Sequence, residues 1–336
     1  MALKTRFTID YYQEGILQNN RVVLAQAITL IESTLPADQT LAGELLDRVL
    51  NQTGKSIRIG ITGVPGAGKS TFIESLGNQV AEADKKLAIL TIDPSSQLTR
   101  GSILGDKTRM ETLSKNSNVF IRPTASGNTL GGVGSRTREA ILLCEAAGYS
   151  IIIIETVGVG QSEVAIKKMV DFFLLLMLAG AGDELQGIKK GIMEMADAVV
   201  ITKADGDNIK QATQAQADYS HALHLFAAGE SGWQPKVLTS SALTGKGIME
   251  IWQMIEGYVH QTKTSGFFDQ NRVRQNISWF HEHFDQLLRT EIMEHNQMQK
   301  KIQALTTEIQ HGNISSYTAA QQLLNEYHQV NRGSNS

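Results

Sequence analysis

An apolar run that ends in a glycine-rich loop constrains the fold of this chain more than any other feature. Residues 57–62 read Ile-Arg-Ile-Gly-Ile-Thr and lead directly into Gly63-Val-Pro-Gly-Ala-Gly-Lys-Ser70, after which residues 71–76 have a helical pattern. This is G-x4-G-K-[ST] in a strand–loop–helix context. Glycines let successive backbone N–H groups turn inward around phosphate oxygens, and the following helix adds the positive end of its dipole. The sequence therefore predicts a phosphate-binding loop on an α/β sheet.

The polar side chains of this loop have distinct expected tasks. Lys69 would neutralise charge on the β- and γ-phosphates of a nucleotide, and the Ser70 hydroxyl would be a ligand of Mg²⁺. We expect three catalytic residues, which are Lys69 and, further along the chain, Glu155 and Gly158. The predicted phosphate-binding residues are Gly63, Val64, Pro65, Gly66, Ala67, Gly68, Lys69, Ser70 and Thr71.

Two further apolar runs end in acidic residues. Asp93 follows residues 87–92, and Glu155 closes residues 151–155. A carboxylate at the carboxyl end of a strand beside a phosphate loop is what Mg²⁺ coordination requires, directly or through water. A single acid at such a place is often only a helix cap, but two that converge on one loop favour a metal. Gly158 follows closely, and its N–H is expected to reach a γ-phosphate.

A later run of apolar residues leads into a possible base-recognition sequence, Thr202-Lys-Ala-Asp205. The Asp205 carboxylate can accept two hydrogens together, from N1–H and the exocyclic amine of guanine, whereas adenine would leave it unpaired. The Lys203 stem can cover the face of the base, and the Ala242 N–H can meet the guanine carbonyl. The pattern thus favours GTP over ATP, with a predicted set of Thr202, Lys203, Asp205, Ser241, Ala242 and Leu243.

Short apolar runs alternate with helical stretches between residues 55 and 265, which predicts a mostly parallel sheet flanked by helices. Residues 1–54 read as a helical N-terminal extension. Residues 266–336 read as a helical C-terminal arm, in which apolar residues from Phe280 to Ile309 predict one long amphipathic helix. Its apolar stripe either folds back on the chain or pairs with a second copy, and we favour the second copy. The expected strands are 57–62, 87–92, 119–121, 151–155, 172–178, 198–202 and 237–240.

Composition excludes several classes of protein. With 31 Lys+Arg against 34 Asp+Glu, the net charge of −3 provides no basic surface for nucleic acid or for anionic lipid. The most apolar run, residues 172–179, is too short for a bilayer-spanning helix. The single cysteine, Cys144, can form neither an intramolecular disulfide nor a multi-cysteine metal cage. The N-terminus lacks the apolar core of a secretory signal, so we expect a cytoplasmic protein.

Four longer motifs carry a family resemblance. They are Asp93-Pro-Ser-Ser96, Leu104-Gly-Asp-Lys-Thr-Arg-Met110, Glu155-Thr-Val-Gly-Val-Gly-Gln-Ser-Glu163 and Gly182-Asp-Glu-Leu-Gln-Gly-Ile-Lys-Lys-Gly191. With the phosphate loop, they resemble the MeaB/ArgK family of P-loop GTPases over nearly the whole chain. The resemblance implies a homodimeric GTPase chaperone that gates cofactor loading and protects an adenosylcobalamin-dependent acyl-CoA mutase, typically methylmalonyl-CoA mutase. It also implies that Asp93, Asp106 and Glu155 surround Mg²⁺.

Two glycine-punctuated segments, residues 101–109 and 180–190, carry charges of both signs and follow expected strands. We interpret them as nucleotide-sensing segments rather than ordinary solvated loops. By the resemblance, residues 180–190 would couple the nucleotide state to the mutase. The chain departs from the usual family residues at Arg100, Gly134, Ser135, Ala179 and Thr202.

No residue can be assigned to position the attacking water, so we expect slow intrinsic hydrolysis that the partner accelerates. Two other functions stay open. A nickel metallochaperone would need a histidine-rich stretch or a Cys/His pair, whereas the eight histidines are scattered. A kinase of a periplasmic amino-acid transport protein would need an acceptor site, and no residue identifies one.

Overall fold

Seven strands form one sheet in which every neighbouring pair is parallel. The structure is a computed structural model of the chain, and it describes residues 7–82, 85–93, 110–125, 135–156, 162–180, 190–224 and 229–333. The spatial order of the strands is β3-β2-β4-β1-β5-β6-β7. The strands are β1 (Ile57–Gly63), β2 (Leu87–Asp93), β3 (Val119–Ala125), β4 (Ile151–Thr156), β5 (Phe172–Leu178), β6 (Ala198–Thr202) and β7 (Lys236–Thr239). All seven predicted strands, and the parallel α/β class, are confirmed.

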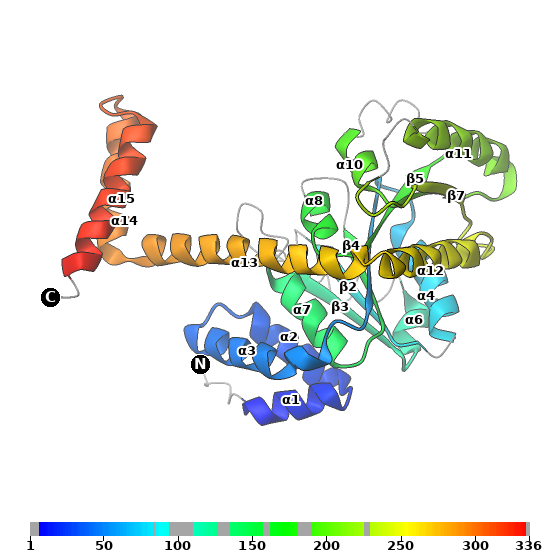
Figure 1. Cartoon of the computed structure of the whole chain (residues 1–336), viewed down its shortest axis with the longest axis horizontal. Coiled ribbons are helices and arrows are strands. Elements are labelled where there is room, and N and C mark those ends of the chain that lie inside the picture. Colours follow the sequence, from blue (N-terminus) through cyan, green and yellow to red (C-terminus); the bar gives the residue numbers. More distant parts are fainter. Residues whose placement is uncertain are drawn as a thin grey trace. The chain divides into compact units, whose positions relative to one another are not determined.

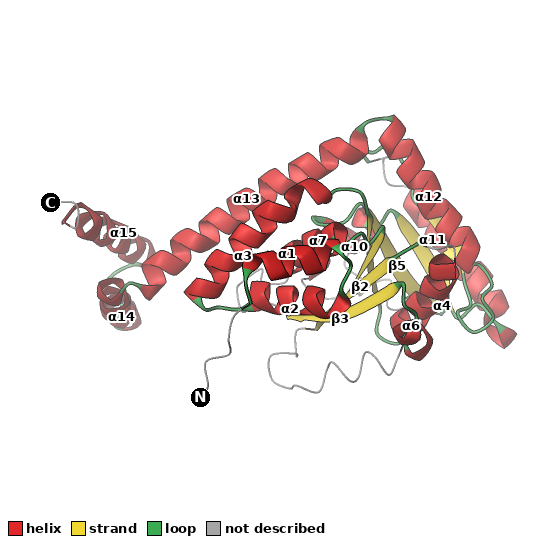
Figure 2. Cartoon of the chain, turned by 90° about the horizontal axis from the view of Figure 1, so that it is seen from below, coloured by secondary structure: helices red, strands yellow, loops and turns green. Residues whose placement is uncertain are grey.

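Apolar residues at consecutive positions bury the central strands on both faces. Every residue of β4 is buried, and so are the first six of β5. Figure 2 shows α7 and the N-terminal helices on one side of the strands, and α4 and α12 on the other. The helices up to the end of β7 are α1 (Ile9–Leu17), α2 (Arg21–Glu32), α3 (Pro36–Val49), α4 (Lys69–Glu82), α6 (Glu111–Lys115), α7 (Ser135–Ala146), α8 (Ser162–Lys167), α10 (Lys190–Met195) and α11 (Ile209–His224), with 3₁₀ turns at Leu50–Gln52 and Gly206–Asn208.

The chain forms two compact units, Met1–Val273 and Arg274–Ser336 (Figure 1). The larger one ends with α12 (Ile248–Thr264) and the first residues of α13 (Phe267–Glu294). The N-terminal extension belongs to this unit, because α1, α2 and α3 all pack on α7. The predicted boundary at residue 265 falls between α12 and α13, and the three-part domain division stays a prediction.

The prediction of one long helix from Phe280 to Ile309 is wrong. The helix is interrupted at His295, where α13 has ended and α14 (Asn296–Gln310) begins. His295 has an extended backbone, and its ring Nδ1 accepts a hydrogen bond from the Gln297 N–H, so it caps the new helix. Gly312 then ends α14 in the left-handed conformation, and α15 (Ser316–Gly333) follows.

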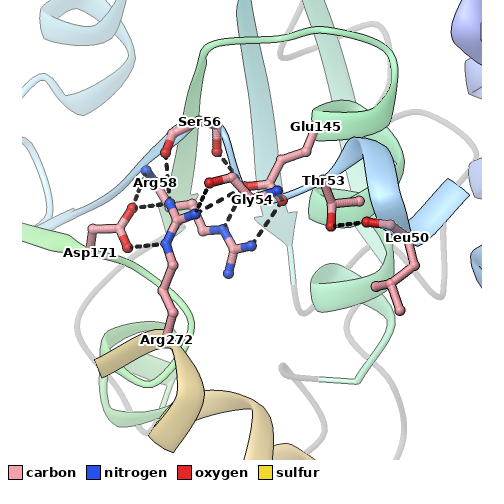
Figure 3. Close-up of polar contacts among 8 residues, drawn as sticks. All are labelled: Leu50, Thr53, Gly54, Ser56, Arg58, Glu145, Asp171 and Arg272. Carbon is pink, nitrogen blue, oxygen red and sulfur yellow. Dashed lines mark hydrogen bonds and ion pairs between the residues drawn. The ribbon is translucent and has the colours of Figure 1, made fainter. Parts of the chain in front are cut away.

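A buried ionic cluster joins β1, α7, the residue before β5 and α13 at the amino ends of the strands (Figure 3). Arg58 of β1 donates two hydrogen bonds of 2.9 Å to Glu145 at the end of α7. Arg272 of α13 donates bonds of 2.8 and 2.7 Å to the two carboxylate oxygens of Asp171. It also donates to the Gly54 and Ser56 carbonyls, at 2.7 Å each. Two carboxylates and two guanidinium groups thus balance one another at buried positions.

The pKa directions within this cluster follow from its geometry. Burial alone would raise the pKa of Glu145, but the hydrogen bonds from Arg58, Ser56 and the Gly54 N–H hold it below its ordinary value. Burial would lower the pKa of Arg272, and its bonds to Asp171 raise it above the ordinary value. The bonds to Glu145 and to Arg272 therefore outweigh the cost of burying these two charged groups.

Replacing Arg272 by methionine tests the cluster. The side chain keeps most of its apolar stem, but Asp171 is left buried without its cation, which typically costs about 3–5 kcal/mol. We expect the Arg272→Met protein to lose that much free energy of unfolding in urea titrations. Arg289→Met, at an exposed position later on α13, should change it by less than about 0.5 kcal/mol. Equal stability of the two variants would contradict the role of the cluster.

Helix α7 carries a second buried acid with a different environment. Glu139 is 4% exposed, and its Oε2 has no hydrogen-bond partner within the described part of the chain. Burial raises the pKa of Glu139 to about 7, against partial opposition from its own backbone N–H, Arg136 and Arg138. The folded protein therefore holds this proton over a pH range in which an unfolded chain would release it.

Stability should consequently fall as pH rises from about 4.5 to about 7, since only the folded state is protonated in that window. Because glutamine cannot ionise, we expect the free energy of unfolding of Glu139→Gln to fall by roughly 2–3 kcal/mol less than that of the wild type over this pH range. Urea unfolding of both proteins at pH 5 and pH 8 measures the difference. Parallel pH dependences of wild type and variant would refute the assignment.

Candidate functional site

The loop between β1 and α4 is shaped by close contact with β5. A Cβ atom on Gly63 would lie 2.4 Å from the Leu176 carbonyl oxygen, so no other residue fits there without a shift of the backbone. Gly66 and Gly68 have φ angles of +79° and +76°, in the left-handed region that favours glycine. The three glycines of the motif thus have two physical reasons. Gly63 avoids a clash with the Leu176 carbonyl, and Gly66 and Gly68 adopt the left-handed backbone conformation.

Lys69 bends back over its own loop. Its Nζ donates to the carbonyls of Gly63 and Val64 at 3.0 and 3.4 Å, and the residue is 9% exposed. Burial lowers the pKa of Lys69 from its ordinary value, and Glu155 opposes that shift. Among the described residues this buried ammonium group donates its hydrogen bonds to carbonyls, which it can exchange for phosphate oxygens.

Ser70 and Glu155 meet at the carboxyl ends of β1 and β4. Parallel pairing sets Ile61 beside Glu155, and the Ser70 Oγ donates to Glu155 Oε1 at 3.0 Å. A hydroxyl oxygen and a carboxylate oxygen are ligands of the kind that Mg²⁺ takes in proteins. The two predicted ligands are therefore adjacent, and their chemistry fits the metal.

The other predicted metal and catalytic residues are less fully described. Asp93 is the last residue of β2, next to β4, and the structure describes only its backbone. Asp106 and Gly158 lie outside the described residues, as do residues 101–109 and 181–189 of the two expected sensing segments. Among the described residues, no three His, Cys, Asp or Glu form a metal-binding group.

The predicted base-recognition residues come together at the ends of β6 and β7. The Ser241 Oγ donates to Asp205 Oδ2, and the Thr244 N–H donates to the Ser241 Oγ at 3.1 Å. The Ala204 N–H donates to the Ser240 carbonyl at 2.9 Å and ties the two loops together. These bonds orient the Asp205 carboxylate before any ligand arrives.

Thr202 connects this region to the phosphate loop. Its Oγ1 lies 2.8 Å from the Ala67 carbonyl oxygen and 3.1 Å from that of Met177, and the residue is buried. Lys203 has a φ of +56°, and its Cε lies 4.0 Å from where a Cβ on Gly68 would be. The Lys203 stem therefore runs beside the phosphate loop.

The remaining predicted residues differ in exposure. Val64 and Ala67 are buried, Pro65 and Thr71 are exposed, Ala242 is intermediate and Leu243 is 85% exposed.

Sequence reasoning missed the contribution of β5, whose Leu176 and Met177 carbonyls accept hydrogen bonds from Val64 and Thr202. The apolar pattern of β5 could not signal it, because the contacts use backbone atoms.

A strand–loop–helix phosphate loop, with Ser70 of α4 hydrogen-bonded to Glu155 at the carboxyl end of β4, defines a P-loop nucleotide-binding protein. The chain also matches the family model described as "Methylmalonyl Co-A mutase-associated GTPase MeaB" over residues 24–297. It belongs to this family of GTPases.

Individual relatives agree with the family. The chain is 46% identical over 321 residues to "Probable GTPase Rv1496" of Mycobacterium tuberculosis, covering 94% of each chain. It is 44% identical over 329 residues to "Methylmalonic aciduria type A homolog, mitochondrial" of Mus musculus, covering 95% of this chain and 79% of that one. A crystal structure titled "LAO/AO transport system kinase" superposes with a TM-score of 0.76 at 37% identity, covering 98% of this chain and all of that one.

Replacing Asp205 by asparagine tests the base site. The amide cannot accept two hydrogens from guanine, so GDP affinity should fall at least about a hundredfold, whereas xanthosine diphosphate should bind the variant better than GDP does. Competition against a fluorescent nucleotide measures both affinities. Asp207→Asn, two residues away at an exposed position, should leave them unchanged. Unaltered GDP affinity of Asp205→Asn would exclude the predicted base contact.

Proposed function

We propose that this protein is a Mg²⁺-dependent GTPase chaperone that binds GTP and GDP, gates adenosylcobalamin loading and protects an acyl-CoA mutase, methylmalonyl-CoA mutase. The observation that carries the proposal is the adjacency of Ser70 and Glu155 beside Lys69, with Asp205 oriented by Ser241 on the same edge of the sheet. The family description, which names the mutase, supports the choice of partner.

The residues divide the chemistry between them. The backbone of residues 63–71 would cradle the phosphates, and Lys69 would balance charge that develops on the β–γ bridge. Ser70 and Glu155 would hold Mg²⁺ together with Asp93 and Asp106, and the Gly158 N–H would contact the γ-phosphate. Bound Mg²⁺ neutralises phosphate charge. Thr202, Lys203, Asp205, Ser241, Ala242 and Leu243 would hold the guanine base.

A homodimer is part of the proposal. On α13, Ile277, Phe280, Phe284 and Leu287 recur every three or four residues, and each is about half exposed or more. Such a stripe matches one side of a helix–helix seam.

The described helices include none long and apolar enough to cross a membrane. We place the protein in the cytoplasm, with no nucleic-acid partner.

The test is GTP turnover by the purified full chain, with and without adenosylcobalamin-dependent methylmalonyl-CoA mutase. We expect the mutase to accelerate turnover at least about tenfold, within the range that partner-supplied groups achieve. Lys69→Ala should abolish turnover in both mixtures. Equal rates with and without the mutase would overturn the chaperone proposal while leaving the nucleotide site intact.

The same preparation separates the two other candidate functions. A nickel metallochaperone would retain Ni²⁺ in equilibrium dialysis, which we do not expect, since Cys144 is buried. A kinase would transfer the γ-phosphate of the nucleotide to a protein acceptor, whereas a GTPase releases it as inorganic phosphate.

A further inference from the structure

A groove of about 510 Å³ lies between α2 and β3. One wall is the outer side of α2, from Arg21 to Thr29, and the other is the segment Val119–Pro123 of β3. Its volume lies in the range of ordinary ligand sites. No residue assigned to GTP or Mg²⁺ lines it.

Arginines link the two walls of the groove at both of its ends. Arg21 donates to the carbonyls of Asn116 and Val119 at 3.3 and 3.1 Å. Arg122 donates to the Thr29 Oγ1 and to Glu32 at 3.1 and 2.8 Å. Arg21 and Thr29 are eight positions apart on α2, so the span is about 12 Å, enough for roughly four extended residues. The groove is therefore preformed and has a defined length.

The β3 wall offers backbone groups because β3 is an edge strand. The Leu87 N–H donates to the Asn118 carbonyl, so alternate residues of β3 from 118 onward face β2. Residues 119, 121 and 123 therefore face the groove. Arg21 occupies the Val119 carbonyl, and Pro123 has no N–H, so within the described part of the chain Ile121 has both a backbone donor and a backbone acceptor to offer.

The charges of the groove are one-sided. Its lining contains two arginines and neither Asp nor Glu. Glu32 balances Arg122, whereas Arg21 bonds only to carbonyls among the described residues, and it stands at the positive end of α2. Lys115 adds a cation next to Asn116. Between these ends, Val22 presents an apolar side chain that is 65% exposed.

We propose that this groove binds a short extended segment of a partner protein, which pairs with the Ile121 backbone and sets an acidic side chain against Arg21. Hydrogen bonds to the Ile121 backbone would orient the bound segment, and Val22 would provide an apolar contact. The Arg21 guanidinium group would select a carboxylate. The proposal is independent of GTP chemistry, because it uses none of the nucleotide-site residues.

The test uses fluorescence anisotropy with a fluorescein-labelled eight-residue peptide of valine and threonine containing two glutamates, and a matched peptide with lysines in their place. Val22→Asp sets a carboxylate beside Arg21 and is benign for folding, because acids are favoured in the first turn of a helix. Leu35→Asp is the control, since Leu35 is 56% exposed, lies outside the groove and occupies a helix N-cap, where Asp is also favoured.

We expect the glutamate peptide to bind the wild type and Leu35→Asp equally, and Val22→Asp at least tenfold more weakly. The lysine peptide should not bind, and bound glutamate peptide should slow hydrogen exchange of the Ile121 amide. Three results would each overturn the proposal: no binding of the glutamate peptide, equal affinity for Val22→Asp, or equal binding of the lysine peptide. Complete displacement by free succinate at the same concentration would also overturn it, in favour of a small-anion site.

Discussion

The larger unit depends on how β1 is held at its two ends. At its start, the Arg58 N–H donates to Asp171 at 2.8 Å, and the Arg58 side chain pairs with Glu145. At its end, Gly63 packs against the Leu176 carbonyl and the chain turns into the phosphate loop. β1 lies between β4 and β5. A shift of β1 would therefore move Ser70 relative to Glu155 of β4, and Val64 relative to the Leu176 carbonyl of β5. The position of the phosphate loop is thus set by contacts a full strand length away.

The charges at the start of the sheet follow one pattern. Asp171 precedes β5, and its carboxylate accepts a hydrogen bond from the Arg58 N–H near the start of β1. Asp197 precedes β6, and its carboxylate accepts a hydrogen bond from the Phe173 N–H of β5. Each acid also has a cation from a helix or its end, Arg272 in the first case and Lys167 in the second. Buried carboxylates are costly without such partners. These two hydrogen bonds link the starts of three neighbouring strands, β1, β5 and β6.

Much of this architecture could be predicted from the sequence. Strands buried on both faces are continuous apolar runs, and the phosphate loop follows one of them with fixed spacing, so β1 and Lys69 were identifiable together. The ionic cluster could not be predicted, because Arg58, Glu145, Asp171 and Arg272 are far apart in the sequence and each resembles a surface charge. The break at His295 was missed for a related reason: the apolar spacing continues across it, and only the backbone conformation reveals it. The roles assigned to the site residues stay predictions.

We expect the phosphate loop after β1 and the oriented Asp205 after β6 to form a single site for Mg²⁺–guanine nucleotide. Calorimetric titration of the full chain with GDP and ADP, each with and without Mg²⁺, tests it most directly. We expect one site per chain, at least about a hundredfold preference for GDP over ADP, and tighter GDP binding with Mg²⁺ than without. Equal affinity for ADP, or GDP binding that Mg²⁺ does not change, would contradict it.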